Sequence, residues 1–212
     1  MNLRLVTPGT ETIVSLTEAK AHLRVFHDDD DGYIEALAAA AQDWLTGENN
    51  WLGRSVVEQG WELTQERFPW RGYCEPWPYS RHHYRNDYHP NALYLPKPPL
   101  KEVTGLFYTP SNGGAEVEIT DFRAIGIADT NGAYLLPAKG QSWPMTDGEP
   151  GSVRVEFTAG YDSVPQSIKH AAMLMVAHWY ENREAVTTDL KGLANLPLAV
   201  DALLAPYRSW PH

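Results

Sequence analysis

Apolar residues recur at helical spacing at the two ends of this chain but not in its middle. The pattern covers residues 16–26, with Phe26 as its last apolar member, and residues 34–45, 168–179 and 200–207. This spacing places the apolar side chains on one face of each helix. Since no single pair of helices can bury that face alone, we expect the N-terminal and C-terminal helices to pack against one another.

Two motifs predict where helices begin. Ser15 and Glu18 form an S-x-x-E capping box, in which each side chain can satisfy a backbone donor of the other residue. Ser163 and Gln166 repeat the pattern, with Pro165 at a position suited to the first turn of a helix. Further along, Pro206 lies inside the last apolar pattern and is expected to kink or end that helix.

Four consecutive aspartates, residues 28–31, separate the two N-terminal helical patterns. A calcium loop of the EF-hand kind needs acidic ligands at alternate positions, a central glycine and a closing glutamate. Consecutive aspartates do not meet this requirement, whereas carboxylates suit the first turn of a helix, where backbone N–H groups lack partners. We therefore interpret the run as the start of the second helix and not as a metal site.

The middle of the chain reads as β-structure. Proline and glycine become frequent there, and short β-type runs replace the helical period. Residues 102–119 predict a hairpin around the turn PSNGG, and Val153, Val155 and Phe157 alternate with polar residues, which predicts a half-buried strand. Further strands are expected within residues 55–68 and 133–137.

The expected fold class is therefore α+β: a small helical bundle from the two terminal segments with an inserted β-rich domain. We expect residues 1–53 to form the N-terminal helical part, residues 54–161 the inserted domain, and residues 162–212 the C-terminal helices and tail that complete the bundle. Residues 69–91 are rich in Pro, Tyr, His and Arg without a clean period. They predict a long exposed loop, and such loops are often functional.

Composition excludes several classes of function. The net charge of −10 disfavours a general nucleic-acid-binding surface. A single cysteine, Cys74, excludes an intramolecular disulfide framework and a cysteine-rich zinc site. There is no apolar run of about 18 residues, so we expect no membrane span. The N-terminus has no apolar signal core, so we expect no secretion signal.

Two groups of residues deserve testing as metal or catalytic sites. His82, His83, Asp87 and His89 are residue types that bind zinc, but their spacing matches no defined site, so a polar contact loop is expected and metal binding stays the alternative.

The second group lies at the end of the most apolar helix, where His178, Glu181 and Glu184 are spaced as on one helix face. They do not form H-E-x-x-H, and no nucleophile, base and orienting residue stand together. A solvated helix end or a contact between subunits is the expected role.

No hydrolase, Walker-type or dinucleotide-binding glycine motif is present. The residues therefore favour a module for binding or assembly, without cofactor or resident metal, over an enzyme. Two alternatives stay open: a metal-dependent hydrolase that uses the His-rich loop, and a carbohydrate- or protein-binding module with an aromatic surface.

Several strings together resemble the head–tail connector (adaptor) proteins of long-tailed bacteriophages and gene transfer agents. In chain order they are VSLTEAKAHLRVFHDDDDGYIEALAAAAQDWL, LPKPPLKEVTGLFY, YLLPAKGQSWP, VRVEFTAGYDSVPQSIKHAAMLMVAHWYENREAV and LPLAVDALLAPYR. The likeness spans residues 13–208 and is interrupted mainly at 69–91, where this chain carries its own insertion.

The resemblance implies a structural virion protein of the head–tail neck, made in the host cytoplasm and without catalytic residues. It implies a dodecameric ring docked under the portal, which extends the DNA channel without binding DNA specifically. The ring would present a surface to the next tail component, a stopper or terminator protein.

The resemblance also directs attention to particular residues. In such a protein the C-terminal segment is expected to engage the portal, and its anchors here would be Tyr207, Arg208 and Trp210, since these residue types dominate protein interfaces. Charges at the end of the long apolar helix would set the register between subunits: Glu181, Arg183 and Glu184. The inserted loop would contact the capsid or a neighbouring subunit through His82, His83, Tyr84 and Tyr88.

Overall fold

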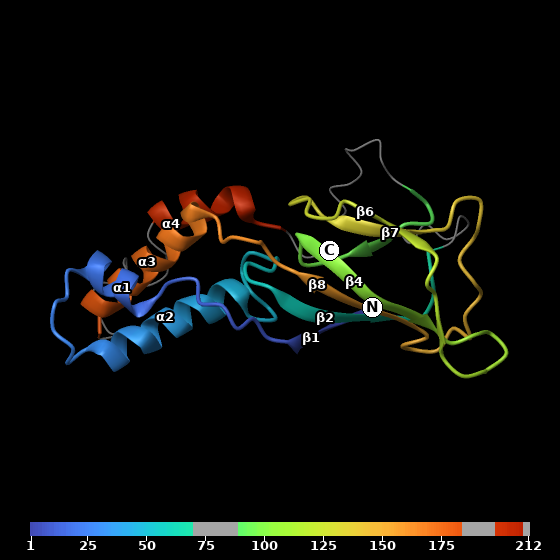
Figure 1. Ribbon diagram of the computed structural model, residues 1–212, viewed down its shortest axis with the longest axis horizontal. Helices are drawn as coiled ribbons and strands as arrows, with labels where there is room; N and C mark the ends of the chain where they lie inside the picture. The colour runs from blue at the N-terminus through green and yellow to red at the C-terminus, as the bar shows by residue number, and fades with distance from the viewer. Residues whose placement is uncertain (70–88, 184–197, 210–212) are drawn as a thin grey trace, which may run out of the picture.

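A computed structural model describes residues 1–69, 89–183 and 198–209 of the chain. The molecule is elongated, with a helical part at one end and a β-rich part at the other (Figure 1). The chain passes between the two parts after β1 (Asn2–Thr7), after α2 (Asp31–Thr46) and after β8 (Val153–Ala159). The expected α+β class is confirmed.

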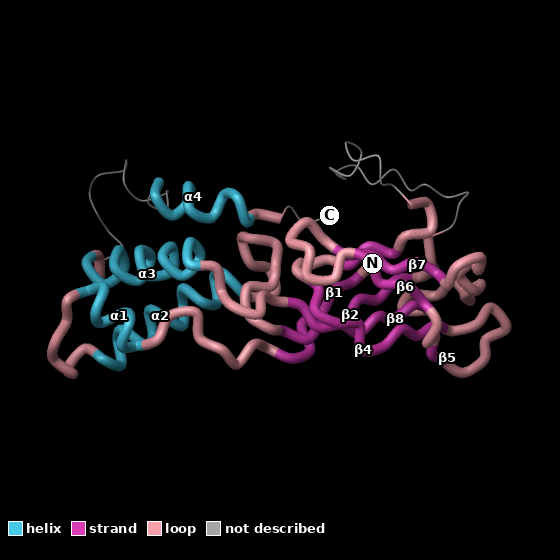
Figure 2. The backbone as a smooth tube through the Cα atoms, turned by 45° about the horizontal axis from the view of Figure 1, so that its top comes forward, coloured by secondary structure: helices cyan, strands magenta, loops and turns pink. Residues whose placement is uncertain are grey.

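The helical part combines both ends of the sequence, as the apolar pattern predicted. Its elements are α1 (Leu16–Leu23), α2, α3 (Gln166–Glu181), α4 (Leu198–Leu204) and a 3-10 turn, η2 (Ala205–Tyr207). The long helix α3 packs against both α2 and α4 (Figure 2). Pro206 lies in η2, so the last α-helix ends before it, as expected.

One predicted helix start is confirmed and one is wrong. The Ser15 side chain accepts from the Glu18 backbone N–H while the Glu18 side chain accepts from the Ser15 backbone, which completes the capping box. Ser163 and Gln166 form no such box, because α3 begins one residue after Pro165 and has no side-chain cap. A proline disfavours helical backbone in the residue before it, so Val164 does not begin a helix capped by Ser163.

The first helix ends sooner than its apolar pattern suggested. Arg24 takes a left-handed backbone conformation, with φ of 58°, and its N–H closes the helix end onto Ala21. Phe26, expected on the apolar face, is therefore outside the helix and 90% exposed.

The β-rich part contains two antiparallel sheets. The larger has the strand order β1, β2 (Gln59–Gln65), β8, β4 (Leu100–Tyr108), β5 (Val117–Glu118). The smaller has the order β3 (Leu93–Leu95), β7 (Ala133–Pro137), β6 (Phe122–Ile125). Residues of both sheets contribute to one apolar cluster, so the sheets pack against each other.

Most predicted strands are found. The hairpin is β4–β5, with Tyr108 paired to Val117, and β8 alternates as expected, with Val153, Val155 and Phe157 buried. Strands β1, β3 and β6 were not predicted. Strand β1 lies within residues 1–53 but pairs with β2 at the edge of the large sheet, so this segment contributes to both parts.

The chain has two apolar cores that meet at a polar joint. The helical core includes Ile34, Leu45, Ile168 and Met175, and the β-rich core is centred on Trp61.

At the joint, the buried Arg54 guanidinium donates to the Tyr161 hydroxyl at 2.5 Å and to the Thr130 carbonyl at 3.3 Å. Lys97 Nζ donates to the Glu48 carbonyl at 2.6 Å. These bonds tie the end of α2 to loops of the β-rich part. None of the helices described is long and apolar enough to cross a membrane.

Candidate interaction surfaces

The far end of α3 is bound to the start of α2. The Tyr180 hydroxyl donates to Asp30 Oδ2 at 2.5 Å, and Arg183 Nη2 lies 3.4 Å from Asp30 Oδ1. The Arg183 guanidinium also lies 4.7 Å from the centre of the Tyr33 ring and 5.1 Å from that of Tyr180, within reach of cation–π attraction. The cluster therefore joins two helices that are far apart in the sequence.

The same contacts shift two pKa values. The hydrogen bond from Tyr180, and then the positive charge of Arg183, lower the pKa of Asp30 below its usual value. The hydrogen bond to Asp30 raises the pKa of Tyr180. Both shifts favour the protonated tyrosine and the ionised aspartate, which is the pair that the structure shows.

These contacts bear on the residues predicted to face a neighbouring subunit. Arg183 keeps 55% of its side chain exposed although its guanidinium is engaged within the chain. Glu181 is exposed on the same helix end. Glu184 lies outside the described residues. An intermolecular role for this helix end would therefore use the exposed side of a cluster that already stabilises the bundle.

The C-terminal segment lies against the turn that follows α2. The Arg208 guanidinium lies 4.3 Å from the centre of the Trp51 ring, which stacks on Trp44 at a centroid distance of 5.4 Å. The Ser209 N–H donates to the Leu52 carbonyl at 2.7 Å. Tyr207 packs against the helical core.

Of the three residues predicted to bind the portal, two are therefore placed, and both contact their own subunit. Trp210 lies outside the described residues. The segment leaves the helical part beside the joint between the two parts, at a position fixed by the Trp51–Arg208 contact and the Ser209 hydrogen bond.

The predicted contact loop is attached to the β-rich part at both of its ends. Phe68, just before it, is buried and stacks on Trp143 at a centroid distance of 4.6 Å. His89, just after it, lies 5.7 Å from Tyr134, ring centre to ring centre. His82, His83, Tyr84, Tyr88 and Asp87 fall outside the described residues.

All four consecutive aspartates have a partner inside the chain, and Asp29 Oδ2 lies 3.8 Å from His27 Nδ1. Lys20 Nζ lies 2.7 Å from Asp28 Oδ1 and 2.6 Å from Asp31 Oδ1, and Asp30 is held by Tyr180. Helix α2 begins at Asp31, as the interpretation of this run predicted. Within the described residues, no group of three His, Cys, Asp or Glu could hold a metal ion.

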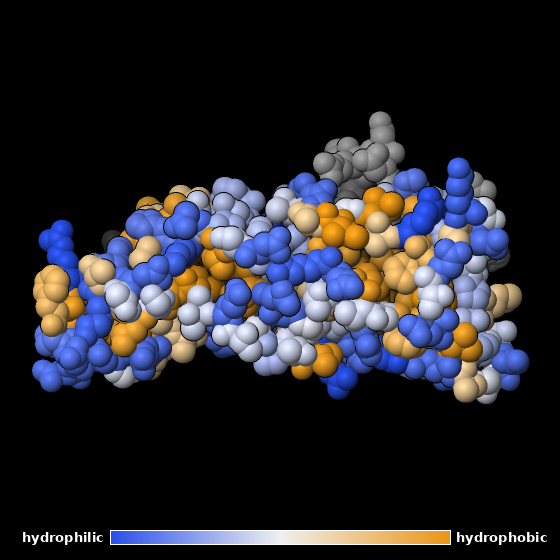
Figure 3. All heavy atoms as spheres, in the orientation of Figure 1, coloured by the Kyte–Doolittle hydropathy of each residue, from blue (hydrophilic) through white to orange (hydrophobic). Residues whose placement is uncertain are grey.

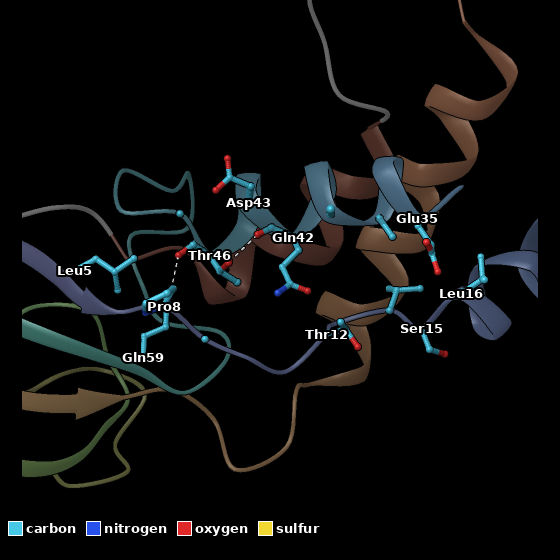
Figure 4. A pocket seen from close by; sticks show the side chains of 15 residues that line it. Leu5, Pro8, Thr12, Ser15, Leu16, Glu35, Gln42, Asp43, Thr46 and Gln59 are labelled. Atoms are coloured by element: carbon cyan, nitrogen blue, oxygen red, sulfur yellow. Dashed lines mark hydrogen bonds between the residues drawn. The ribbon is translucent and has the colours of Figure 1, made fainter. Parts of the chain in front are cut away.

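A groove of about 580 Å³ lies between α2 and the segment that joins β1 to α1 (Figure 4). Its apolar lining includes Val14, Leu16, Ala38 and Ala39, and its charged residues are Glu35 and Asp43. No sequence signal pointed to this groove, because its two walls come from segments with different periodicity.

The groove also contains an unusual polar atom. Gln59 is 3% exposed and donates from Nε2 to the Thr46 carbonyl at 2.9 Å. Its Oε1 atom is buried without a hydrogen-bond partner among the described residues. Buried polar atoms are nearly always paired, so this acceptor is an exception.

An apolar patch lies on the β-rich part. Figure 3 shows apolar side chains gathered over β6 and β7. Ile125 at the end of β6 and Ile127 just after it are 38% and 54% exposed. Strand β6 is the outer strand of the smaller sheet, so this patch adjoins a sheet edge.

Comparison with known proteins gives these surfaces a context. Residues 13–68 match the model of a family described as phage gp6-like head-tail connector proteins. The resemblance to head–tail connectors is confirmed. No curated protein matches the chain at a significant level.

Solved structures match the chain over its whole length. A chain from the neck of an empty GTA particle, computed with C6 symmetry, has a TM-score of 0.65 and 21% identity, over 100% of this chain and 97% of that one. A chain from the virion of a native gene transfer agent has a TM-score of 0.64 at 21% identity, with the same coverage.

A chain from the neck of a native GTA particle, computed with C12 symmetry, has a TM-score of 0.62 at 22% identity, again over 100% of this chain and 97% of that one. This connector-like chain therefore has the fold of a GTA neck protein. Together the comparisons show a connector-family match at residues 13–68 and the fold of a neck component over the whole chain.

Proposed function

We propose that this protein is a connector subunit that forms a ring between the portal and the tail. The observation that carries the proposal is the coincidence of two independent matches. The connector family matches residues 13–68, and the fold of a neck component matches the whole chain. The ring would extend the DNA channel and present the surface to which a stopper or terminator protein attaches.

The shape of the molecule supports a ring. Subunits of a ring meet head to tail, so each needs two different surfaces that fit each other. The two-part, elongated molecule offers different surfaces on its helical and β-rich parts (Figure 1). One of the similar necks was computed with C12 symmetry, and we propose twelve subunits here as well.

Charge is compatible with a channel for DNA. The net charge of −10 per subunit disfavours tight binding to phosphate, so DNA could pass without being held.

The C-terminal segment is our proposed contact with the portal, through Tyr207, Arg208 and Trp210. The stack of Arg208 on Trp51 supports this role, since it fixes where the segment emerges from the subunit. A fixed starting point lowers the entropy lost when a segment docks on a partner.

Two further contacts are part of the proposal. The helix end with Glu181, Arg183 and Glu184 would contribute to the interface between subunits. The loop with His82, His83, Tyr84 and Tyr88 would contact the capsid or a neighbouring subunit. The protein would be made in the host cytoplasm and act in the virion neck.

Co-assembly with the portal protein encoded in the same genome tests this function. Purified subunit and portal would be mixed at low salt and examined by negative-stain electron microscopy. A ring added beneath the portal is the expected result, and its absence at all ratios would contradict the proposal. Metal analysis of the same sample tests the alternative of an enzyme that uses the His-rich loop.

A further inference from the structure

Two surfaces of the helical part have features that their own subunit does not use. One is the turn between α1 and α2, residues 24–30, which we name the tip. The other is the groove between α2 and the β1–α1 segment. The tip follows the last residue of α1, whereas the groove is lined by Leu16, the first residue of α1. The tip and the Leu16 part of the groove are therefore at opposite ends of that helix.

The tip presents an aromatic ring to solvent. Phe26 is 90% exposed, more than any other large apolar residue described here. Beside it, Arg24 is exposed and makes no ion pair with a described residue. Aromatic and arginine side chains are the usual anchors of protein interfaces.

The tip is held in a defined shape. Arg24 closes the end of α1, and the Val25 N–H donates to the Lys20 carbonyl at 3.0 Å. The Lys20 ammonium bridges Asp28 and Asp31 at 2.7 and 2.6 Å. A turn fixed in this way loses little entropy when it binds, which favours its use as a docking element.

The groove has the chemistry that such a tip requires. Its apolar wall carries small residues, Ala38 and Ala39, which leave room for an aromatic ring. Glu35 and Asp43 line it with negative charge and form no ion pair with a described residue.

We propose that the tip of one subunit inserts into the groove of the next subunit in the ring. Phe26 would lie on the alanines of α2, and the Arg24 guanidinium would face the carboxylates of the groove. Asp28 and Asp29, whose side chains are 90% and 96% exposed on the tip, must then point away from Glu35 and Asp43. This inference rests on the proposed ring.

A head-to-tail contact explains why both surfaces occur in one chain. In a ring each subunit contributes one surface to the neighbour on one side and the complementary surface to the neighbour on the other. Within one molecule the tip and the part of the groove at Leu16 are separated by the length of α1. If the tip of each subunit binds the groove of the next, both the tip and the groove of every subunit in the ring are occupied.

The first test measures how substitutions in the tip and the groove change the yield of portal-bound rings. Phe26→Asp should lower the yield of portal-bound rings by about tenfold or more, because it removes a central apolar anchor. Arg24→Glu should lower the yield too, and the double variant Arg24→Glu with Glu35→Arg should restore it. Met145→Asp is the matched control, since Met145 is 80% exposed but lies in the β-rich part. Thermal unfolding of each variant should match the wild type.

Disulfide trapping provides the second test. In a Cys74→Ser background, His27→Cys with Ala39→Cys should give a ladder of covalent oligomers in rings under mild oxidation. The pair His27→Cys with Met145→Cys should give none. A ladder together with the loss caused by Phe26→Asp supports the tip-in-groove contact.

The remaining outcomes contradict the inference in distinguishable ways. Rings that form normally with Phe26→Asp and Arg24→Glu, without a ladder, would overturn the contact and leave the proposed function intact. Trapping of the tip cysteine on the portal, and not on a second copy, would overturn the choice of partner. If wild-type protein adds no ring to the portal, the proposed function fails and the inference fails with it.

Discussion

The Tyr180 hydroxyl donates a 2.5 Å hydrogen bond to the Asp30 carboxylate and so joins the last turn of α3 to the residue before α2. The two residues are 150 positions apart in the sequence. Arg183 faces the same carboxylate from the end of α3. The bond therefore closes the helical part at the end that is farthest from the sheets (Figure 1).

The first prediction concerns this bond and its dependence on pH. The pKa of Asp30 is lowered in the folded chain, so its contribution to stability is present above the unfolded pKa and is lost as the pH falls through the folded pKa. We expect Tyr180→Phe to lower the melting temperature at pH 7 and to have a smaller effect at strongly acidic pH. Circular dichroism melts at several pH values measure this.

The control for the first prediction is Asp29→Asn, because the Asp29 side chain is 96% exposed. It should leave the melting temperature unchanged. If Tyr180→Phe behaves like this control at neutral pH, the bond does not contribute to folding.

The second prediction compares the two S-x-x-E/Q motifs. Ser15→Ala removes the N-cap of α1 and should lower the free energy of unfolding by about 1 kcal/mol. Ser163→Ala should change it by less than about 0.5 kcal/mol, since Ser163 is exposed and does not cap α3. Urea denaturation of the two variants makes the comparison, and equal losses would show that the Ser15 cap is not stabilising.

These two predictions show where the sequence was informative. Signals contained within a few residues were interpreted correctly: the Ser15 capping box, the β4–β5 hairpin and the alternation of β8. The Ser163 motif failed because a neighbouring proline fixed the start of the helix. In this case the backbone restriction that a proline places on the residue before it outweighed the preference of serine for the N-cap position.

Features that depend on distant partners were missed. Strand β1 has only a weak alternation of its own and becomes a strand by pairing with β2, more than fifty residues later. Strand β3 has three residues, too few for a pattern. The contact of Arg183 with Asp30 was also missed, because the two residues are 153 positions apart in the sequence; the predicted role of Arg183 at a subunit interface stays a prediction.

Among the candidate surfaces, some are marked by residue type within a short segment, and others exist only where distant segments meet. Tyr207 and Arg208 were predicted as interface anchors from their residue types, and that role stays a prediction, since the structure shows only their contacts within the subunit. The groove needs Gln59 of β2 beside α2, and only the folded chain brings these together. Phe26 was expected on the apolar face of the first helix because nothing in the sequence marks the end of that helix. The helix ends at Arg24 in a left-handed conformation, which glycine or asparagine usually adopts.

The third prediction concerns the joint between the two parts. Burial lowers the pKa of Lys97 from 10.5 to about 8, although its ammonium donates to the Glu48 carbonyl and lies 5.0 Å from the centre of the Trp61 ring. The folded chain therefore binds this proton less tightly than the unfolded chain. As a result, the Lys97 contribution to the free energy of unfolding should rise from about pH 8 to about pH 10.5.

Lys97→Met removes the titrating group and should remove this rise. The stability of the wild type relative to the variant should therefore increase across the same pH window, as measured by urea denaturation at each pH. Lys139→Met, at an exposed lysine, is the control and should leave the shape of the wild-type curve unchanged. Parallel curves for wild type and Lys97→Met would contradict the assignment.

The fourth prediction tests how firmly the C-terminal segment is held. Gly53 and Gly113 share a left-handed backbone, with φ of +68° and +71°, so alanine at either position adds a similar strain of about 1–2 kcal/mol. A Cβ at Gly53 would lie 2.0 Å from the Ser209 carbonyl oxygen, whereas one at Gly113 would meet nothing within 4 Å. Gly53→Ala should therefore destabilise the chain more than Gly113→Ala and speed proteolytic removal of its last residues. Equal effects on both would mean that the segment moves aside freely, and that the turn after α2 does not fix its direction for the portal.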